Sequence, residues 1–587
     1  MSALSTARTR GLQTALLGAP LVLLFVLLLV YPVSQLLLLS AYSEGSFTLV
    51  NYRQLFASSV YINVMLITLK ISLWTTLFAV IGGYPVAYLI SSLPKEKKTS
   101  WLFWILLSFW TSFLVRAFAW IVMLGRNGVV NQWLTAAGLQ DRPSNLLYSL
   151  GAVLVGMVHA LMPLAVLTML SVMDNIDRNL PRAALTLGAR PGSAFWRVYF
   201  PLSMPGVSAG AIMVFVTAIG FFIVPALLGG RREIMITQLI IEQVQQTMNW
   251  GFAGAISVLL LIVVLSVFAI YDKLVGLSTM AAGASDSSQA AGHGDGKMRR
   301  AGGAILGALG TATDALLALL PRSRHPSKPG RGLPLRGFVL LILFFLSVPA
   351  LLMIPLSFSG KSGLNWPPSG FSLRFYQELF NSPLWIQAAF RSLVVGLCTA
   401  FLAMLIGTPA AFLLARTQIK GKSLMLAFVL SPIMIPRMII AVGLFYVFSR
   451  LGLVGTSFGL VLGHTVIAVP YVVMTMMAVL RNYDSRLDLA AYSLGARPWQ
   501  TLRHVTFPIL AAGLMSSFLF AFATSFDELT IALFTTGGLS ATLPKQFWDE
   551  VTLQISPVIA AVSTCLFVFI AALIWLADML QRRGVIR

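Results

Sequence analysis

Residues 183–201 read AALTLGARPGSAFWRVYFP, and residues 490–508 read AAYSLGARPWQTLRHVTFP. The two segments lie 307 residues apart and are identical at ten of their nineteen positions. In each copy a glycine, Gly188 or Gly495, occurs where a helix would end, and the proline three residues later suits the first turn of a second helix. The repeat therefore predicts a helix, a tight stop and a second helix, made twice by one chain.

The chain around the two copies has the composition of a membrane protein. Of its 587 residues, 58% are hydrophobic and 10% are charged, and the mean hydropathy is +0.86. These values exclude an ordinary soluble protein. Apolar stretches long enough to cross a bilayer fall at about residues 12–40, 63–90, 100–123, 147–172, 205–228 and 252–274, and again at 335–357, 386–414, 423–448, 457–480, 510–534 and 556–579.

These stretches divide into two sets of six, and each set has one copy of the repeated segment between its fourth and fifth member. An even number of spans places the start of both halves on the same side, so the halves are parallel repeats related by an axis along the membrane normal. We expect an all-α polytopic membrane protein of two six-helix repeats. The first half is residues 1–275, with its loop at about 174–204; a linker, 276–334, precedes the second half, 335–587, with its loop at about 482–509.

Basic residues predict which side of the membrane carries the two copies. Eight arginines lie in or beside them: Arg178, Arg182, Arg190, Arg197, Arg481, Arg486, Arg497 and Arg503. The positive-inside rule makes this side the cytoplasm, with both termini on it. The net charge of +22 is then explained by insertion into the bilayer, and no nucleic-acid partner is expected. The apolar run after Arg8 and Arg10 is too long for a secretory signal, so we interpret it as the first span.

The linker, residues 276–334, is rich in Gly, Ala, Ser, Arg and Pro, which is typical of a tether between domains. Within it, residues 302–320 read GGAILGALGTATDALLALL. This stretch is apolar but rich in glycine and contains Asp314, and a span here would spoil the six-plus-six arrangement. We expect it to lie in the cytoplasm or on the membrane surface, and the linker to be dispensable.

The repeated segment resembles the EAA loop of ATP-binding cassette importer permeases, which has Glu-Ala-Ala, a following glycine and a later apolar–Pro pair. The resemblance implies the type I importer permease fold, with each loop docked as a coupling helix in a cleft of a homodimeric cytoplasmic ATPase. The coupling residues would be Ala183, Ala184, Gly188 and Arg190 in the first copy, and Ala490, Ala491, Gly495 and Arg497 in the second. The glutamate of the pattern is replaced by Arg182 and Leu489.

The sequence contains no complete nucleotide-binding loop. Gly-Lys-Ser occurs at Gly360 and Gly421, but Pro355 and Arg416 stand where a phosphate-binding loop needs its first glycine. The resemblance therefore implies that ATP and Mg²⁺ are used by the partner ATPase and that this chain binds no cofactor itself. The small residues of each loop suit a close approach to another protein. The alternative is that each loop only covers its own bundle.

Two further strings are similar to the spermidine/putrescine type of importer permease. Residues 110–132, WTSFLVRAFAWIVMLGRNGVVNQ, resemble its first permease, and residues 525–538, SFDELTIALFTTGG, resemble its second. The resemblance implies that both permease subunits are fused in one chain in a bacterial inner membrane. A periplasmic solute-binding protein would deliver a small solute that contains an amine.

Charged side chains within spans are costly, so they are candidates for function. Asp527 and Glu528 fall in the eleventh span, whereas Gly220 and Phe221 stand 307 residues earlier. The carboxylates could attract a substrate ammonium or pair with a basic side chain at a gate.

Arg116 and Arg437 are the matching cations, for which internal pairing or snorkelling is the alternative. In the family the position of Arg437 is commonly acidic. A basic residue there favours a zwitterionic amino-acid derivative over a plain polyamine. Trp110 and Trp120 could stack on an alkylammonium group, or could be core or lipid-facing residues.

Three classes of protein remain: an ATP-driven importer permease, an ion-coupled secondary transporter and a membrane enzyme. Parallel repeats occur in some secondary transporters as well, but an ion-driven carrier needs no pair of ATPase docking loops. An enzyme is disfavoured because the sequence has no HExxH motif and no nucleophile elbow. Cys398, Cys565, His159 and His464 fall in predicted spans and are interpreted as packing residues, without a metal site or disulfide.

Overall fold

The computed structural model is helical apart from one two-residue hairpin. It describes residues 17–43, 46–275, 306–316, 333–361, 363, 366–368, 370–417, 421–554 and 556–585. The elements up to the linker are η1 (Val26–Val30), α2 (Tyr31–Leu39), β1 (Tyr42–Ser43), β2 (Ser46–Phe47), α3 (Val50–Ala57), α4 (Ser59–Ser92), α5 (Lys95–Trp110), α6 (Phe113–Leu124), α7 (Val129–Ala136), α8 (Leu150–Met173), α9 (Asn179–Thr186), α10 (Pro191–Ala194), η2 (Phe195–Tyr199), α11 (Phe200–Ile219), α12 (Ile223–Leu228), α13 (Ile236–Gln245) and α14 (Trp250–Val275).

The second half repeats this series. Its elements are α17 (Leu333–Ser357), α18 (Arg374–Asn381), α19 (Pro383–Arg416), α20 (Lys422–Met434), α21 (Arg437–Leu451), α22 (Ser457–Arg481), α23 (Arg486–Ser493), α24 (Pro498–Thr501), η4 (Leu502–Thr506), α25 (Phe507–Phe526), α26 (Thr530–Thr535), η5 (Gly538–Ser540), α27 (Leu543–Leu553) and α28 (Val558–Val585). Of the linker, residues 306–316 form a helix; the remainder of its predicted range up to 332 lies outside the described residues.

The described ranges contain eleven helices long and apolar enough to cross a membrane, and the bent pair of α20 and α21 makes a twelfth. The first of these spans, Leu17–Leu39, lies within the predicted stretch 12–40, of which residues 12–16 lie outside the described part. The prediction of an all-α protein with many spans is therefore confirmed.

Each half is built around three long helices that pack together, α4, α8 and α11 in the first and α19, α22 and α25 in the second. The two cores use glycine at the same place. A Cβ on Gly206 would lie 2.8 Å from Val172, and a Cβ on Gly513, 307 residues later, would lie 2.6 Å from Val479. In each half, the backbone of the fifth span thus contacts a valine side chain of the fourth span. The two contacts lie at matching positions, so the repeat extends from the loops into the core.

The first span of each half packs against the other half. Helix α2 contacts α21, and α17 contacts α4, α5 and α6. Phe25, in the helical turn before η1, lies edge-on to Phe428 of α20 with ring centroids 5.5 Å apart. The two halves are therefore interlocked rather than merely adjacent.

The structure corrects four of the predicted spans, which are interrupted rather than continuous. The stretch 100–123 breaks between α5 and α6, and 423–448 bends by 89° between α20 and α21. At the first break, the Ser112 hydroxyl accepts a hydrogen bond from the Leu114 N–H and so begins a new helix. At the second, Pro436 disfavours a helical conformation of the residue before it. The stretches 205–228 and 510–534 break in the same way, into α11 and α12 and into α25 and α26.

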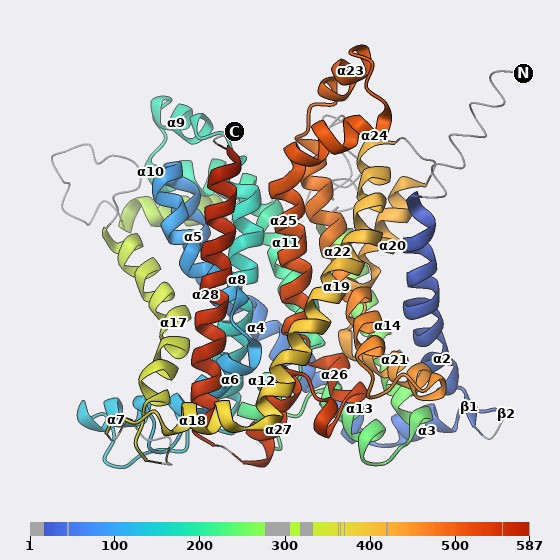
Figure 1. Cartoon of the computed structure of the whole chain (residues 1–587). Coiled ribbons are helices and arrows are strands. Elements are labelled where there is room, and N and C mark those ends of the chain that lie inside the picture. Colours follow the sequence, from blue (N-terminus) through green and yellow to red (C-terminus); the bar gives the residue numbers. More distant parts are fainter. Residues whose placement is uncertain are drawn as a thin grey trace, which may run out of the picture.

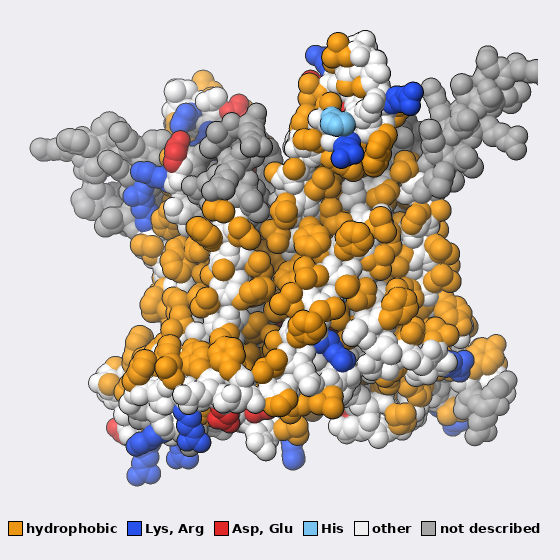
Figure 2. Space-filling view, viewed as in Figure 1, with side chains coloured by type: hydrophobic (Ala, Val, Ile, Leu, Met, Phe, Trp, Pro, Cys, Tyr) orange, Lys and Arg blue, Asp and Glu red, His pale blue; other side chains and the backbone are white. Residues whose placement is uncertain are grey.

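The two repeated loops project from the same side of the helix bundle, which we call the loop side. Figure 1 shows α9, α10, α23, α24 and the end of α28 there, and the short helices α7, α13, α18 and α27 at the opposite side. In Figure 2 the wide belt between these two sides is covered by hydrophobic side chains, and most Lys, Arg, Asp and Glu side chains in view gather at its two ends. This surface suits a bilayer.

Candidate coupling loops and transport pathway

The two repeated loops have the same backbone. In the first, Gly188, two residues after the last residue of α9, has φ +90°, and in the second, Gly495, two residues after the last residue of α23, has φ +86°. Each glycine is therefore in the left-handed conformation that ends a helix. Nothing lies within 4 Å of a Cβ added at either position, so the backbone alone requires glycine there.

The predicted coupling residues are similarly exposed in both loops. Ala183 and Ala490 are exposed, Ala184 and Ala491 are half-buried, and the glycines and arginines at the remaining positions are exposed: Gly188, Gly495, Arg190 and Arg497. Next to the glycines, Leu187 and Leu494 are 88% and 89% exposed. Leucines this exposed mark a surface suited to a protein partner, and sequence reasoning had not named them.

The second loop is anchored by Asp488, which sequence reasoning missed. Its carboxylate accepts hydrogen bonds from Arg416 Nη1 at 2.8 Å, Tyr483 Oη at 2.7 Å and Thr506 Oγ1 at 2.9 Å. Burial alone would raise the pKa of Asp488, but the hydrogen bonds from Tyr483 and Thr506 and the charge of Arg416 lower it below its ordinary value. The available signal was an acidic residue directly before Leu489, where the family pattern has its glutamate.

The first loop has different anchors. Pro181 stands 307 residues before Asp488, so that carboxylate has no counterpart. Instead, Arg178 Nη1 donates to the Ser92 carbonyl at 3.0 Å, and Lys98 pairs with Asp174. The exposed surface of the repeat is thus alike in the two halves, while the contacts that hold it differ.

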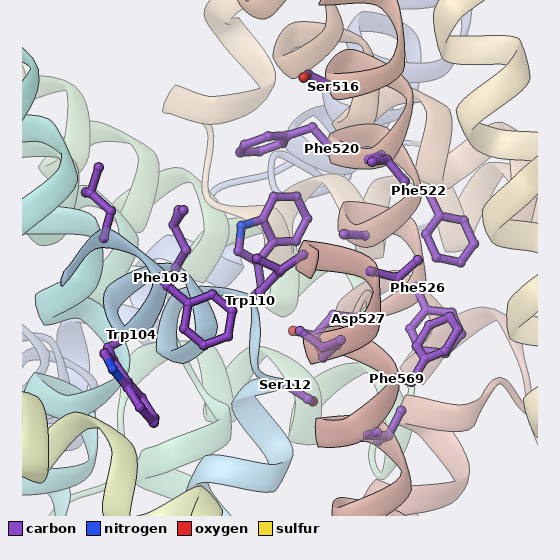
Figure 3. A pocket seen from close by; sticks show the side chains of 18 of the residues that line it. Phe103, Trp104, Trp110, Ser112, Ser516, Phe520, Phe522, Phe526, Asp527 and Phe569 are labelled. Carbon is purple, nitrogen blue, oxygen red and sulfur yellow. The ribbon is translucent and has the colours of Figure 1, made fainter. Parts of the chain in front are cut away.

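A cavity of about 1370 Å³ lies between α5 of the first half and α25 and α28 of the second. Its lining is mostly apolar and aromatic. Figure 3 shows the Trp110 and Phe520 rings next to each other at the cavity, with Asp527 below them at the end of α25. The Trp110 and Phe520 ring centroids are 4.9 Å apart. The structure therefore brings two predicted residues, Trp110 and Asp527, to one cavity.

Asp527 connects the two halves. Its carboxylate interacts with the Ser112 hydroxyl and the Phe113 N–H at the start of α6, and Ser112 lines the same cavity. Gly220 stands 307 residues before Asp527, at the end of α11, and lies against Pro436. A Cβ added at Gly220 would lie 3.4 Å from the Cβ of this proline. A charged contact on one side of the molecule thus corresponds to an uncharged one on the other.

Glu528 does not line the cavity. It is 2% exposed and accepts hydrogen bonds from the Thr530 and Ile531 N–H groups, both at 2.9 Å, at the start of α26. One of its oxygens lies 3.5 Å from His464 Nε2. This carboxylate therefore caps the start of α26, which is a structural role. Because Asp527 and Glu528 are adjacent in the sequence, the sequence alone did not separate this role from a role in the cavity.

Arg116 and Arg437 lie within electrostatic range of the two acids without forming a direct ion pair with either of them among the described residues. Arg116 is 2% exposed and donates to the Ala160 carbonyl at 3.0 Å. Arg437 donates to Tyr471 Oη at 3.2 Å and interacts electrostatically with both Asp527 and Glu528. Two cations and two anions at the breaks of the spans therefore balance each other within the protein.

Trp120 lies away from the cavity, in the core. Its ring packs 5.7 Å from those of His159 and Phe345. His159 and His464 are both buried, as packing residues should be. Among the described residues, no group of three or more His, Cys, Asp or Glu side chains is arranged to hold a metal ion.

Two interlocked six-span halves, each with an exposed helix–stop–helix loop on the same side, define a polytopic membrane protein with a duplicated surface loop. The chain belongs to the family described as binding-protein-dependent transport system inner membrane components, whose model matches residues 9–275 and 403–584.

Its relatives include two different permease subunits. The chain is 34% identical over 225 residues to the spermidine/putrescine transport system permease protein PotB of Escherichia coli, which is 38% of this chain and 82% of that protein. It is 30% identical over 249 residues to PotC of Haemophilus influenzae, which is 42% of this chain and 96% of that protein. One chain thus carries both permeases of the spermidine/putrescine type.

Among solved structures, this chain is similar to one chain of a bacterial alginate ABC transporter in complex with an alginate pentasaccharide-bound periplasmic protein. The match covers 46% of this chain and 96% of the transporter chain. The sequence identity is 18% and the TM-score 0.41.

Proposed function

We propose that this chain is the complete membrane part of an ATP-driven, binding-protein-dependent importer for a small solute that contains an amine. The single observation that carries the proposal is the pair of loops with the same backbone and the same exposure, at Leu187 and Leu494, on one side of the bundle. A duplicated surface suits a two-fold symmetric partner. That partner is a homodimeric cytoplasmic ATPase, which binds ATP and Mg²⁺.

The loops transmit the ATPase cycle to the spans. Each has an exposed apolar tip beside a small-residue face, so the ATPase can approach its backbone closely. The short helix after each glycine runs directly into η2 and α11 or η4 and α25, so movement of the loop moves the fifth span. The loop side faces the cytoplasm, together with both termini, because the arginines gather there. A periplasmic solute-binding protein docks on the opposite side.

The solute passes between the halves, where Asp527 supplies a negative charge in a mostly apolar and aromatic cavity, and a second acid, Glu96, lines it at the first turn of α5. Trp110 and Phe520 offer π faces to an alkylammonium group. The amine competes with Arg116 and Arg437 for the carboxylate, and Arg437 becomes available to an anionic group of the solute. The relatives transport spermidine and putrescine, and the balanced charges favour a zwitterionic derivative over a plain polyamine.

The docking assignment is tested with the chain purified together with the ATPase that accompanies it, in lipid nanodiscs. Gly188→Val with Gly495→Val forces a branched side chain into a left-handed backbone conformation. We expect stimulated ATP hydrolysis to be abolished while insertion and helix content remain normal. Gly138→Val is the matched control, since that glycine also has positive φ and open space but lies outside the loops. Normal stimulation in the double variant would contradict the assignment.

The solute is tested by uptake into vesicles with labelled putrescine, spermidine and a panel of zwitterionic amino-acid derivatives. We expect uptake that requires ATP and the binding protein, with a zwitterion preferred. Uptake driven by an ion gradient without ATP would identify a secondary transporter instead. Efficient transport of a plain diamine that is insensitive to Asp527→Asn would contradict both the substrate class and the role of Asp527.

A further inference from the structure

The first loop is covered by a segment of the linker. The Asp314 carboxylate, in helix 306–316, accepts hydrogen bonds from the Gly192 N–H at 2.7 Å, the Ser193 N–H at 3.1 Å and the Ser193 hydroxyl at 2.6 Å. Asp314 is 6% exposed. Chiefly because of the Ser193 hydroxyl, the pKa of Asp314 lies below its ordinary value, so the carboxylate is charged at neutral pH. Charge-assisted bonds of this kind are the strong ones.

The contact is close enough to need small residues on both sides. A Cβ added at Gly192 would lie 2.7 Å from Asp314 Oδ1, and a Cβ added at Gly310 would lie 3.3 Å from the Ser193 Cα. The Trp196 indole N–H also donates to Thr313 Oγ1 at 2.9 Å. Helix 306–316 is thus fitted to α10 along its length.

The second loop is capped from within its own sequence instead. Trp499 occupies the position of Gly192 and is 64% exposed, so a helix could not approach the backbone there. Gln500 occupies the position of Ser193, and its Oε1 accepts a hydrogen bond from the Arg497 N–H at 2.8 Å. The backbone donors at the start of α10, in contrast, are satisfied by a residue more than a hundred positions away.

We propose that helix 306–316 is a built-in part of the first coupling loop and positions it against its ATPase subunit, so that the two ATPase subunits dock on non-equivalent surfaces. The inference rests on the proposed function. On the first side the surface combines α9 with the linker helix, which leaves Leu309 and Leu316 exposed. On the second side it is α23 with the exposed Trp499. The linker is then a positioning element rather than a passive tether.

The test uses the matched pair Leu187→Cys and Leu494→Cys, placed separately in a full chain with Cys398 and Cys565 replaced by alanine. Each is crosslinked to the co-purified ATPase. We expect Asp314→Ala to lower the crosslinking yield from Leu187→Cys by up to about tenfold, the factor for one lost charge-assisted hydrogen bond, and to leave Leu494→Cys unchanged. Thr311→Ala, on the exposed side of the same helix, should change neither.

Backbone hydrogen exchange in residues 190–196 reports the contact itself. We expect Asp314→Ala to raise exchange there about tenfold. If exchange does not rise, or if it rises while crosslinking from Leu187→Cys stays the same or increases, the positioning role is wrong. Absence of crosslinking from both cysteines in the otherwise unaltered chain would instead contradict the docking loops, and with them the proposed function.

Discussion

The two repeated loops are alike at their exposed tips and different where they are held. Leu187 and Leu494 are almost equally exposed, and Gly188 and Gly495 share one backbone conformation. The first loop is supported by Asp314 of the linker, whereas the second is supported by Asp488. The repeat therefore keeps the exposed tips of the two loops more alike than the contacts beneath them.

The largest effect is expected from removing the support of the second loop. Asp488→Ala leaves Arg416 without its carboxylate and removes the acceptor of Tyr483 and Thr506. We expect a loss of about 3 kcal/mol in local stability and of most transport. Thermal unfolding and vesicle uptake measure the two effects. The control is Asp484→Ala, whose exposed carboxylate only accepts from the Arg486 N–H, and if it is equally damaging the anchoring role of Asp488 is not supported.

Two roles of the linker can be tested separately: the support that helix 306–316 gives to the first loop, and the covalent connection between the halves. Residues 1–275 are co-expressed with either 306–587 or 335–587. We expect the longer partner to restore uptake, because helix 306–316 can dock on α10 without being covalently attached to the first half, and the shorter partner to restore much less. Membrane insertion is checked by immunoblotting. Equal uptake from both pairs would show that the linker is dispensable, as its composition had predicted.

The two sides of the pathway differ as the loops do, because Asp527 corresponds to Gly220. We expect Asp527→Asn to raise the half-saturating concentration of an amine solute about tenfold, or about 1.4 kcal/mol, because a charge is lost from an apolar cavity. Ser112→Ala removes the hydroxyl beside Asp527 but keeps the charge of the carboxylate, so it should have less effect. If Ser112→Ala is as severe as Asp527→Asn, the carboxylate acts as a latch between the halves rather than as a solute contact.

The smallest effect concerns pH. The pKa of Asp488 is lowered in the folded protein, so its contribution to stability is complete above the ordinary value of 3.8 and is lost only as the pH falls through the folded-state value. The stability difference between the parent chain and Asp488→Asn should therefore stay constant on going from neutral to mildly acidic pH and shrink only in stronger acid. Thermal unfolding across this range measures it. A stability difference that already shrinks near pH 6–7, about two to three pH units above the ordinary pKa of an aspartate, would contradict the lowered pKa of Asp488.

Several site residues could be predicted because their chemistry is unusual for their surroundings. Asp527 stood out as a carboxylate within a span, and the cavity contains it. Glu528 had the same signal, yet it caps α26, because adjacent residues at a helix end point in different directions. Trp110 and Trp120 were equal candidates, and only the break between α5 and α6 placed one in the cavity and the other in the core.

The sequence by itself determined the approximate positions of the spans, but not the breaks in four of them, and it determined the duplicated loops and the family, since hydropathy and repetition are properties of short, contiguous stretches. Tertiary structure alone decided the supports: Asp314 meets Gly192 from 122 residues away, and Arg416 meets Asp488 from 72. It also decided that Asp527 reaches Ser112 in the other half. Local patterns could not reveal such pairs, because a hydrogen bond depends on where two distant backbones are brought together, and packing of the whole bundle sets that position.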